Sequence, residues 1–227
     1  MTSQHGQDAY VLAALGHRRA GYFLDSGASN GVRSSNTRLL EEEYGWTGIC
    51  VEPNPRYYAE LTANRRCFSV NCCLYDHEGT VEFVEAGTIG GILGEYSPQM
   101  LTHVRRALEL PDDAPMPVTV VPCRTVGSLL REFGAPRVID YWSLDTEGSE
   151  LAILRTFPFG RYLLRMLTVE HNWGPDRRPV HDLLARHGFV RVAELGCDDV
   201  YAHRSVVSRG GAWRSQALSA RGRGRPS

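Results

Sequence analysis

The stretch 22–31, which reads YFLDSGASNG, constrains the fold of this chain more than any other. It begins with three apolar residues that predict a buried strand, and it then passes through Asp25 into a turn of small residues. A polar segment over 33–44 follows at once and predicts a helix. A strand, a tight turn and a helix in this order bring backbone N–H groups and a helix N-terminus against a ligand. This unit therefore predicts an α/β fold with a ligand site at the end of its first strand.

The acid in this turn and a second acid downstream indicate what kind of ligand binds. Asp25 would repel a pyrophosphate, whereas a carboxylate suits a ligand whose near end is cationic or rich in hydroxyl groups. Residues 46–51 predict the next strand, and Glu52 ends it about 20 residues beyond the glycine turn, the spacing at which an acid meets ribose hydroxyls. S-adenosylmethionine combines an ammonium, a sulfonium and a ribose, so we expect it as the cofactor.

Two alternatives stay open for this turn. A nicotinamide dinucleotide would bind a similar unit and would make the protein an oxidoreductase. However, the G-x-G-x-x-G pattern is absent, because Ala28, Ser29 and Asn30 separate Gly27 from Gly31. The other alternative is a turn whose glycines only permit tight packing.

The residues expected to hold the cofactor lie before the first strand, on the glycine turn and after the next two strands. They are Gln7, Asp25, Ser26, Gly27, Asn30, Gly31, Ser35, Asn36, Glu52, Pro53, Asn71 and Cys72. Asp25 and the glycine turn would hold the methionine end, and Glu52 the ribose diol. Asn71 and Cys72 would face the adenine. The hydroxyl and amide residues 34–37 are also natural caps for the following helix, which is compatible with binding.

Two later strands end in acids as well. One buried-type strand ends in Asp145, with Glu147 two residues further on, and an apolar strand over 166–169 precedes Glu170 and His171. The carboxyl ends of parallel strands meet at one edge of a sheet, so we expect these side chains to face the cofactor. Asp145, Glu170 and His171 are candidate ligands of a hard divalent cation. Asp145, Glu147 and His171 are candidate catalytic residues, with His171 or Glu147 as the base. The alternative for Glu170 and His171 is an ordinary His–Glu pair on the protein surface, with no metal and no catalytic role. Ser149 is expected to cap the helix that follows.

Composition and charge limit the function classes. All 25 basic residues are arginine, so no lysine can act as a base or nucleophile. Without the five arginines of 208–227, the chain has 20 basic and 26 acidic residues, a net charge of −6, which argues against nucleic-acid binding.

No apolar run is long enough to span a membrane, so a cytoplasmic location is expected. The six cysteines show no C-x-x-C spacing and are interpreted as reduced core residues.

Strands and helices alternate along the chain and predict one doubly wound, mostly parallel sheet. The hairpin 189–194 and 199–203 should add antiparallel strands at its end. We expect a single domain over 1–207 and a disordered Arg/Gly/Ser-rich tail over 208–227. The irregular segment 87–117, with a helix from about 98 to 110, is interpreted as a substrate lid, and a passive insertion is the alternative.

The motif set resembles the FkbM-type family of S-adenosylmethionine-dependent methyltransferases. The matching pieces cover roughly 3–203 and are Ser3-Gln4, Gln7-Asp8, 23–31 (FLDSGASNG), 35–37, 45–48 (GWTG), 51–55 (VEPNP), 64–65, 139–150 (IDYWSLDTEGSE) and 169–170. The resemblance implies a class I methyltransferase fold and O-methylation of a natural-product, sugar or polysaccharide hydroxyl. Structurally similar sugar methyltransferases use magnesium, which the resemblance places near Asp145, Glu170 and His171. A non-catalytic cofactor-binding protein of the same fold is the remaining alternative. The sequence leaves the acceptor and the oligomeric state undetermined.

Overall fold

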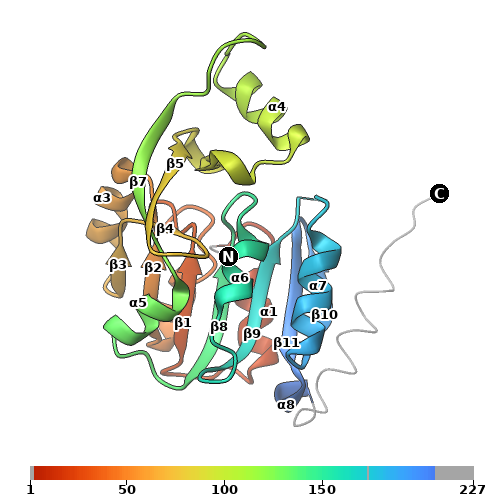
Figure 1. The fold of residues 1–227 in the computed structure, drawn as a ribbon. Helices are drawn as coiled ribbons and strands as arrows, with labels where there is room; N and C mark the ends of the chain where they lie inside the picture. Colours follow the sequence, from red (N-terminus) through yellow and green to blue (C-terminus); the bar gives the residue numbers. More distant parts are fainter. Residues whose placement is uncertain (1–2, 173, 208–227) are drawn as a thin grey trace, which may run out of the picture.

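The computed structural model describes residues 3–172 and 174–207 of the 227-residue chain. The tail that the sequence predicts over 208–227 lies outside the described residues. Seven strands form a central sheet in the order β10-β11-β9-β8-β1-β2-β3 (Figure 1). They are β1 (Tyr22–Ser26), β2 (Thr47–Val51), β3 (Phe68–Val70), β8 (Val138–Leu144), β9 (Leu163–Glu170), β10 (Phe189–Leu195) and β11 (Asp198–His203).

The pairing within this sheet confirms the predicted topology. β3, β2, β1, β8 and β9 pair in parallel, whereas β11 pairs antiparallel with both β9 and β10. The strand order reverses between β1 and β8, so the loops that leave these two strands diverge and open a crevice. The sheet is thus doubly wound and mostly parallel, with an antiparallel C-terminal hairpin.

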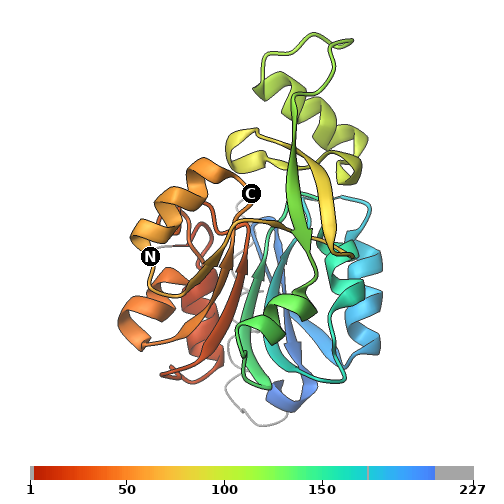
Figure 2. The same ribbon diagram turned by 60° about the vertical axis from the view of Figure 1, so that its left-hand side comes forward.

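Helices cover both faces of the central sheet (Figure 2). On one face lie α1 (Gln7–Ala14), α2 (Arg38–Tyr44) and α3 (Pro55–Asn64), and on the other lie α5 (Val126–Glu132), α6 (Glu150–Thr156) and α7 (Arg177–Arg186). The alternation of side chains along β1 serves both layers, because Phe23 packs with the first group and Leu24 with the second. The short α8 (Arg204–Val207) follows β11.

Local capping explains where several helices begin. The Asn54 side chain accepts hydrogen bonds from two backbone N–H groups of the first turn of α3, and Pro55 occupies its first position. Thr125 caps α5 by accepting from the N–H of Ser128. All six cysteines are free; Cys50, Cys72, Cys73 and Cys123 are buried as expected of core residues, whereas Cys67 and Cys197 are partly exposed.

The segment 87–117 is more regular than the sequence suggested. It contains η1 (Gly87–Ile89), β6 (Gly91–Ile92), η2 (Leu93–Glu95) and α4 (Pro98–Ala107). A second sheet in the order β4-β7-β5-β6 carries it, formed with β4 (Cys73–Leu74), β5 (Gly79–Val84) and β7 (Val118–Arg124). This sheet and α4 stand above the carboxyl ends of β1 and β8 in Figure 1.

Two local predictions from the sequence are wrong. The helix predicted over 33–44 begins at Arg38, because Ser34 has a left-handed backbone with φ of 54° and the Ser35 hydroxyl accepts from the N–H groups of the next turn. Ser149 makes no capping hydrogen bond to α6. Its hydroxyl instead donates to the Thr146 hydroxyl at 2.9 Å and so braces the turn before the helix.

Candidate functional site

A cavity of about 480 Å³ opens at the carboxyl ends of β1, β2 and β8. Its size is within the range of small-molecule and cofactor sites. Residues of the glycine turn, of the loops after β2 and β8 and of the segment 87–92 line it. Nine of the predicted cofactor residues are among them, namely Gln7, Asp25, Ser26, Gly27, Ser35, Asn36, Glu52, Pro53 and Cys72.

Close backbone contacts hold the ends of β1 and β8 together. The N–H of Asp145 donates to the carbonyl of Ser26 at 3.1 Å, and the N–H of Gly27 donates to the carbonyl of Val51 at 3.0 Å. Gly27 has φ of 79°, and a Cβ at this position would lie 1.8 Å from the carbonyl oxygen of Asp145. Only glycine permits this approach. The glycine turn therefore fixes the distance between the two strand ends that form the cavity floor.

The buried carboxyl of Asp25 is held by a hydrogen-bond network. The Thr37 hydroxyl donates to Asp25 Oδ2 at 2.5 Å, and Arg65 Nη2 donates to the Thr37 hydroxyl at 3.0 Å. Arg65 also pairs with Glu41. Burial raises the pKa of Asp25, while the charge of Arg65 and the hydrogen bond from Thr37 oppose this shift. Thr37 and Arg65 thus fix the orientation of Asp25, and neither role could be read from the sequence.

Asn36 presents an unsatisfied acceptor at the cavity. Its Nδ2 donates to the Ser143 hydroxyl at 2.9 Å, which orients the amide. Among the described residues, no group donates to its buried Oδ1. A buried acceptor without a donor is costly, so a ligand that brings a positively charged N–H group would stabilise this position. The methionine ammonium of the expected cofactor supplies such a donor.

Glu52 is held by the backbone at the end of β2. Its two carboxylate oxygens accept from the N–H groups of Ser29, at 2.7 Å, and Asn54, at 2.8 Å. Burial raises the pKa of Glu52 to about 7, and these two hydrogen bonds oppose the shift. The carboxylate is therefore fixed in place next to the glycine turn, where the ribose is expected.

Three of the predicted cofactor residues do not line the cavity. Asn30 orders the following loop, since its Oδ1 accepts from the N–H groups of Val32 and Arg33. Gly31 packs against Arg65. Asn71 Nδ2 donates to the carbonyls of Glu52 and Pro53. These residues shape the loops that carry the lining.

Gln7 lines the cavity, yet both ends of its amide are already bonded within the protein. Its Nε2 donates to Asp198 Oδ2 at 2.6 Å, and its Oε1 accepts from the N–H of His5 at 2.8 Å. The side chain therefore joins the N-terminal segment to the start of β11. Its contribution to the site is to hold this wall of the cavity.

Three carboxyl groups gather beside the cavity, and their ligand oxygens lie within 4.8 Å of one another. They belong to Asp145, Glu147 and Glu170. Burial raises the pKa of Asp145 to about 7 and that of Glu147 to about 9. Burial, followed by the charge of Asp145, raises the pKa of Glu170. Asp145 and Glu170 also share a hydrogen bond, so one proton can lie between them.

A buried acid holds the turn that carries Glu147. Glu150 accepts from the N–H groups of Thr146 and Gly148 at 2.7–3.2 Å. Glu147 itself has a left-handed backbone with φ of 58°, a strained conformation for a residue other than glycine. Its side chain accepts a hydrogen bond from Asn172. Glu150 therefore positions the turn, a role that the sequence prediction missed.

The structure does not bring His171 into the group formed by Asp145 and Glu170. His171 instead lies with Glu194 and Asp199, within 4.8 Å of both. Burial and the charge of Arg177 lower the pKa of His171. The third carboxyl beside Asp145 and Glu170 comes from Glu147, which the sequence had offered only as a base.

A second cavity of about 850 Å³ adjoins the first and lies between the segment 94–103, the loop after β8 and α7. Both cavities are lined by the same five residues, namely Met100, His103, Glu147, Glu170 and Asn172. His103 had no distinctive setting in the sequence. The helix α4 brings it to this shared wall, which only the folded position of the insertion reveals.

Comparison with known protein families identifies the family to which the chain belongs. Residues 25–195, about three quarters of the chain, match the family described as the methyltransferase FkbM domain. The chain belongs to the FkbM methyltransferase family. This confirms the resemblance inferred from the motifs, and it favours a methyltransferase over the nicotinamide-dependent alternative. The strand order and the antiparallel hairpin agree with a class I methyltransferase fold.

Solved structures similar to this FkbM-family chain are distant. They include an RNA methyltransferase candidate from Pyrococcus horikoshii (12% identity, 88% of this chain and 83% of that chain, TM-score 0.42). They also include the METTL16 methyltransferase domain (11% identity, 86% of this chain and 64% of that chain, TM-score 0.45). A third is precorrin-6y C5,15-methyltransferase from Geobacter metallireducens GS-15 (13% identity, 86% of this chain and 84% of that chain, TM-score 0.41). Comparison with curated sequences gave no match. Likeness at this level indicates nothing about the acceptor.

Within residues 3–172 and 174–207, no helix has the length and apolar character needed to cross a membrane. The cytoplasmic location stays a prediction.

Proposed function

We propose that the protein transfers a methyl group from S-adenosylmethionine to a hydroxyl group of a small natural product or sugar. The observation that carries this proposal is the wall shared by the two cavities. The first cavity has the strand-end acids expected for the cofactor, and Glu147 and Glu170 lie where it meets the second. An acceptor in the second cavity would place its hydroxyl next to these carboxyl groups.

The described residues fit the cofactor at both of its ends. Asn36 Oδ1 is an acceptor without a donor, and Glu52 is a fixed carboxylate next to the glycine turn. When bound, S-adenosylmethionine supplies an electrophilic methyl group on its sulfonium. The contribution of the protein is to orient the two reactants and to exclude water.

The acceptor hydroxyl must lose its proton during transfer, and the carboxyl cluster is suited to receive it. The raised pKa of Asp145, about 7, lies near physiological pH, where a general base is most effective. Glu147 and His171 remain the bases proposed from the sequence, and His103 lines the same wall. Asp145, Glu147 and Glu170 also form a set of oxygen donors that fits Mg²⁺, which would lower the pKa of the hydroxyl.

The charges of the second cavity support an acceptor that is neutral or cationic. Among the described residues that line it, Arg177 is the one arginine, and it is already bound. Its Nε and Nη2 donate to the two oxygens of Asp199 at 2.9 and 2.7 Å, and it also pairs with Glu194. A phosphate or carboxylate on the acceptor would therefore meet acids without a free cation.

Substitution of Asp145 tests the role of the cluster. We expect Asp145→Asn to lower the rate of transfer of a radiolabelled methyl group at least about 100-fold. The dissociation constant of S-adenosylhomocysteine should change less than about threefold. Asp112→Asn, in an exposed loop of the insertion, is the control and should change neither value. Equal losses of binding and turnover would contradict the assignment of Asp145 to the chemistry.

A panel of acceptors tests the charge preference and separates an enzyme from a non-catalytic protein. We expect neutral or amino sugars to be methylated with a kcat/KM at least about tenfold above that of their phosphorylated analogues. A preference for the phosphorylated sugars would overturn the charge argument. If S-adenosylhomocysteine binds but no hydroxyl compound is methylated, the non-catalytic alternative is favoured.

A further inference from the structure

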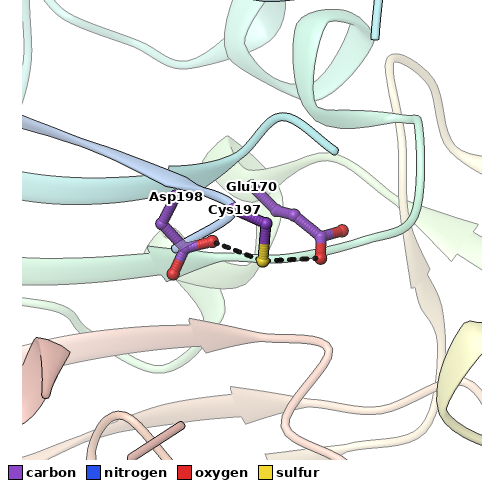
Figure 3. A group of neighbouring side chains, drawn as sticks. All are labelled: Glu170, Cys197 and Asp198. Atoms are coloured by element: carbon purple, nitrogen blue, oxygen red, sulfur yellow. Dashed lines mark hydrogen bonds between the residues drawn. The ribbon is translucent and has the colours of Figure 1, made fainter. Parts of the chain in front are cut away.

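A partly buried thiol lies between the half-buried carboxyl group of Glu170 and the buried one of Asp198, at the edge of the first cavity (Figure 3). Cys197 Sγ is 3.7 Å from Glu170 Oε1 and 3.9 Å from Asp198 Oδ1. A thiol has one proton and can donate it to only one of these oxygens at a time. The ligand atoms of all three residues lie within 4.8 Å of one another.

The backbone fixes this group in place. Glu170 ends β9, Cys197 lies in the turn before β11, and Asp198 begins β11. Asp198 and Glu170 are directly opposite in the antiparallel ladder of β11 and β9. The N–H of His171 donates to the carbonyl of Cys197 at 2.9 Å. The three donors therefore converge from rigid elements and need little reorganisation to bind a common ligand.

Within the described part of the chain no arginine pairs with this group, and the basic side chains that act on Asp198 are the imidazoles of His5 and His171. Two other buried acids pair with arginine, since Asp140 binds Arg165 and Asp199 binds Arg177, whereas buried Glu150 is held by backbone N–H groups. Asp198, 5% exposed, follows Cys197 directly, yet no arginine within the described residues forms an ion pair with Asp198 or with Glu170. Gln7 occupies Asp198 Oδ2 and leaves Oδ1 turned to the thiol. A metal ion bound between these carboxyl groups would balance their charge.

The distances suit a tetrahedral metal ion. With a metal–sulfur bond of about 2.3 Å and a metal–oxygen bond of about 2.0 Å, neighbouring sulfur and oxygen ligands are about 3.5 Å apart. The observed separations from Sγ, 3.7 and 3.9 Å, are close to this value. The thiolate also sets the metal class, since sulfur favours zinc-like ions over magnesium.

We propose that Glu170, Cys197 and Asp198 bind a divalent transition metal of the zinc class, with a fourth position open to solvent or ligand. Binding forms the metal–sulfur bond and releases the thiol proton to solvent, with no change of oxidation state. The ion would fasten the β10–β11 turn to the end of β9 and so rigidify one wall of the first cavity. This site differs from the proposed magnesium site in its sulfur ligand and shares only Glu170 with it.

Cobalt(II) is the probe, because a thiolate bound to it produces a near-ultraviolet charge-transfer absorption that carboxylates and magnesium do not. We expect the full-length protein, freed of metal by a chelator, to develop this band with one equivalent of cobalt. Zinc should then displace the cobalt and abolish the band. Cys197→Ser should remove the band and weaken zinc binding at least about tenfold. Asp198→Asn should weaken zinc binding while retaining a thiolate band.

Cys67→Ser is the matched control, because Cys67 is also half-buried but lies against Cys50 on the other side of the fold. It should retain the band. Zinc should raise the thermal midpoint of the wild type and of this control but not that of Cys197→Ser. A band that survives in Cys197→Ser or disappears in Cys67→Ser would overturn the proposal, as would the absence of any band in wild-type protein that still binds S-adenosylhomocysteine.

Discussion

At the scale of single residues, the site concentrates carboxyl groups that burial makes difficult to ionise. The pKa values of Glu52 and Asp145 are raised to about 7, and that of Glu147 to about 9. Among the described residues, arginine pairs with the buried acids Asp140 and Asp199 but with no member of the carboxyl cluster. These groups therefore lower the stability of the ligand-free fold, as expected where residues are selected for chemistry rather than for packing.

Substitution of Glu147 should show how much the buried carboxyl group destabilises the fold, as a difference in melting temperature that depends on pH. Its pKa is raised on folding from 4.5 to about 9, so the folded protein holds the proton more tightly, and stability falls as pH rises between these values. Glu147→Gln removes the titration. We therefore expect the variant and the wild type to melt nearly together at pH 4, below both pKa values, and the variant to melt at least about 2 °C higher at pH 9.

Thermal unfolding of the ligand-free, chelator-treated protein across this range measures the effect. The exposed substitution Glu82→Gln should leave the difference near zero at every pH. If Glu147→Gln melts below the wild type at pH 9, the carboxylate is stabilised in the fold rather than strained.

Site residues at strand ends could be predicted from the sequence, whereas those supplied by packing could not. Asp25, Glu52 and Asp145 follow recognisable strands, so their positions at one edge of the sheet follow from topology. His103 lies outside every motif, and the motif piece 64–65 does not indicate that Arg65 reaches Thr37 at the site. Arg65 follows α3, and α4 carries His103 in the insertion, so only the packing of these elements brings them near.

At the scale of elements, the insertion is built on a sheet of its own. The sequence predicted the helix near 98–110, but not that β5 and β7 pair with each other in a sheet separate from the central one. Thr80 pairs with Pro122 and Val84 with Val118 across 34–42 residues of sequence, and no local pattern encodes such a register. The resulting platform carries α4, whose Met100 and His103 line both cavities, and its role as a substrate cover stays a prediction.

Contact between the insertion and the turn after β8 should control acceptor binding. A Cβ on Gly148, where φ is 123°, would lie 2.7 Å from the carbonyl oxygen of Glu95 in η2. Gly148→Ala must therefore displace η2 or the turn. We expect the KM for the acceptor to rise at least about tenfold, while the dissociation constant of S-adenosylhomocysteine is nearly unchanged.

Gly94 offers a matched control on the same 3₁₀ helix, because a Cβ there would meet no atom within 4 Å and its φ is ordinary. Gly94→Ala should leave both values unchanged. Steady-state kinetics and calorimetry separate the two steps. An unchanged KM in Gly148→Ala, with the fold intact, would show that this contact does not shape the acceptor site.

At the scale of the whole molecule, one arrangement explains the fold and the site together. The reversal of strand order between β1 and β8 opens the first cavity, and the insertion adds the second above it. The two cavities meet at the carboxyl cluster. A cofactor held below and an acceptor held under the insertion would therefore meet at one wall, as direct methyl transfer requires.

The most direct test of this account is calorimetric titration of the purified protein with S-adenosylhomocysteine, with magnesium and again with a chelator. The first cavity supplies Asn36, Glu52 and the glycine turn without a metal, so we expect micromolar binding under both conditions. NAD⁺, titrated in parallel, should not bind. Binding of NAD⁺ in place of S-adenosylhomocysteine, or no binding of S-adenosylhomocysteine under either condition, would contradict the proposed function.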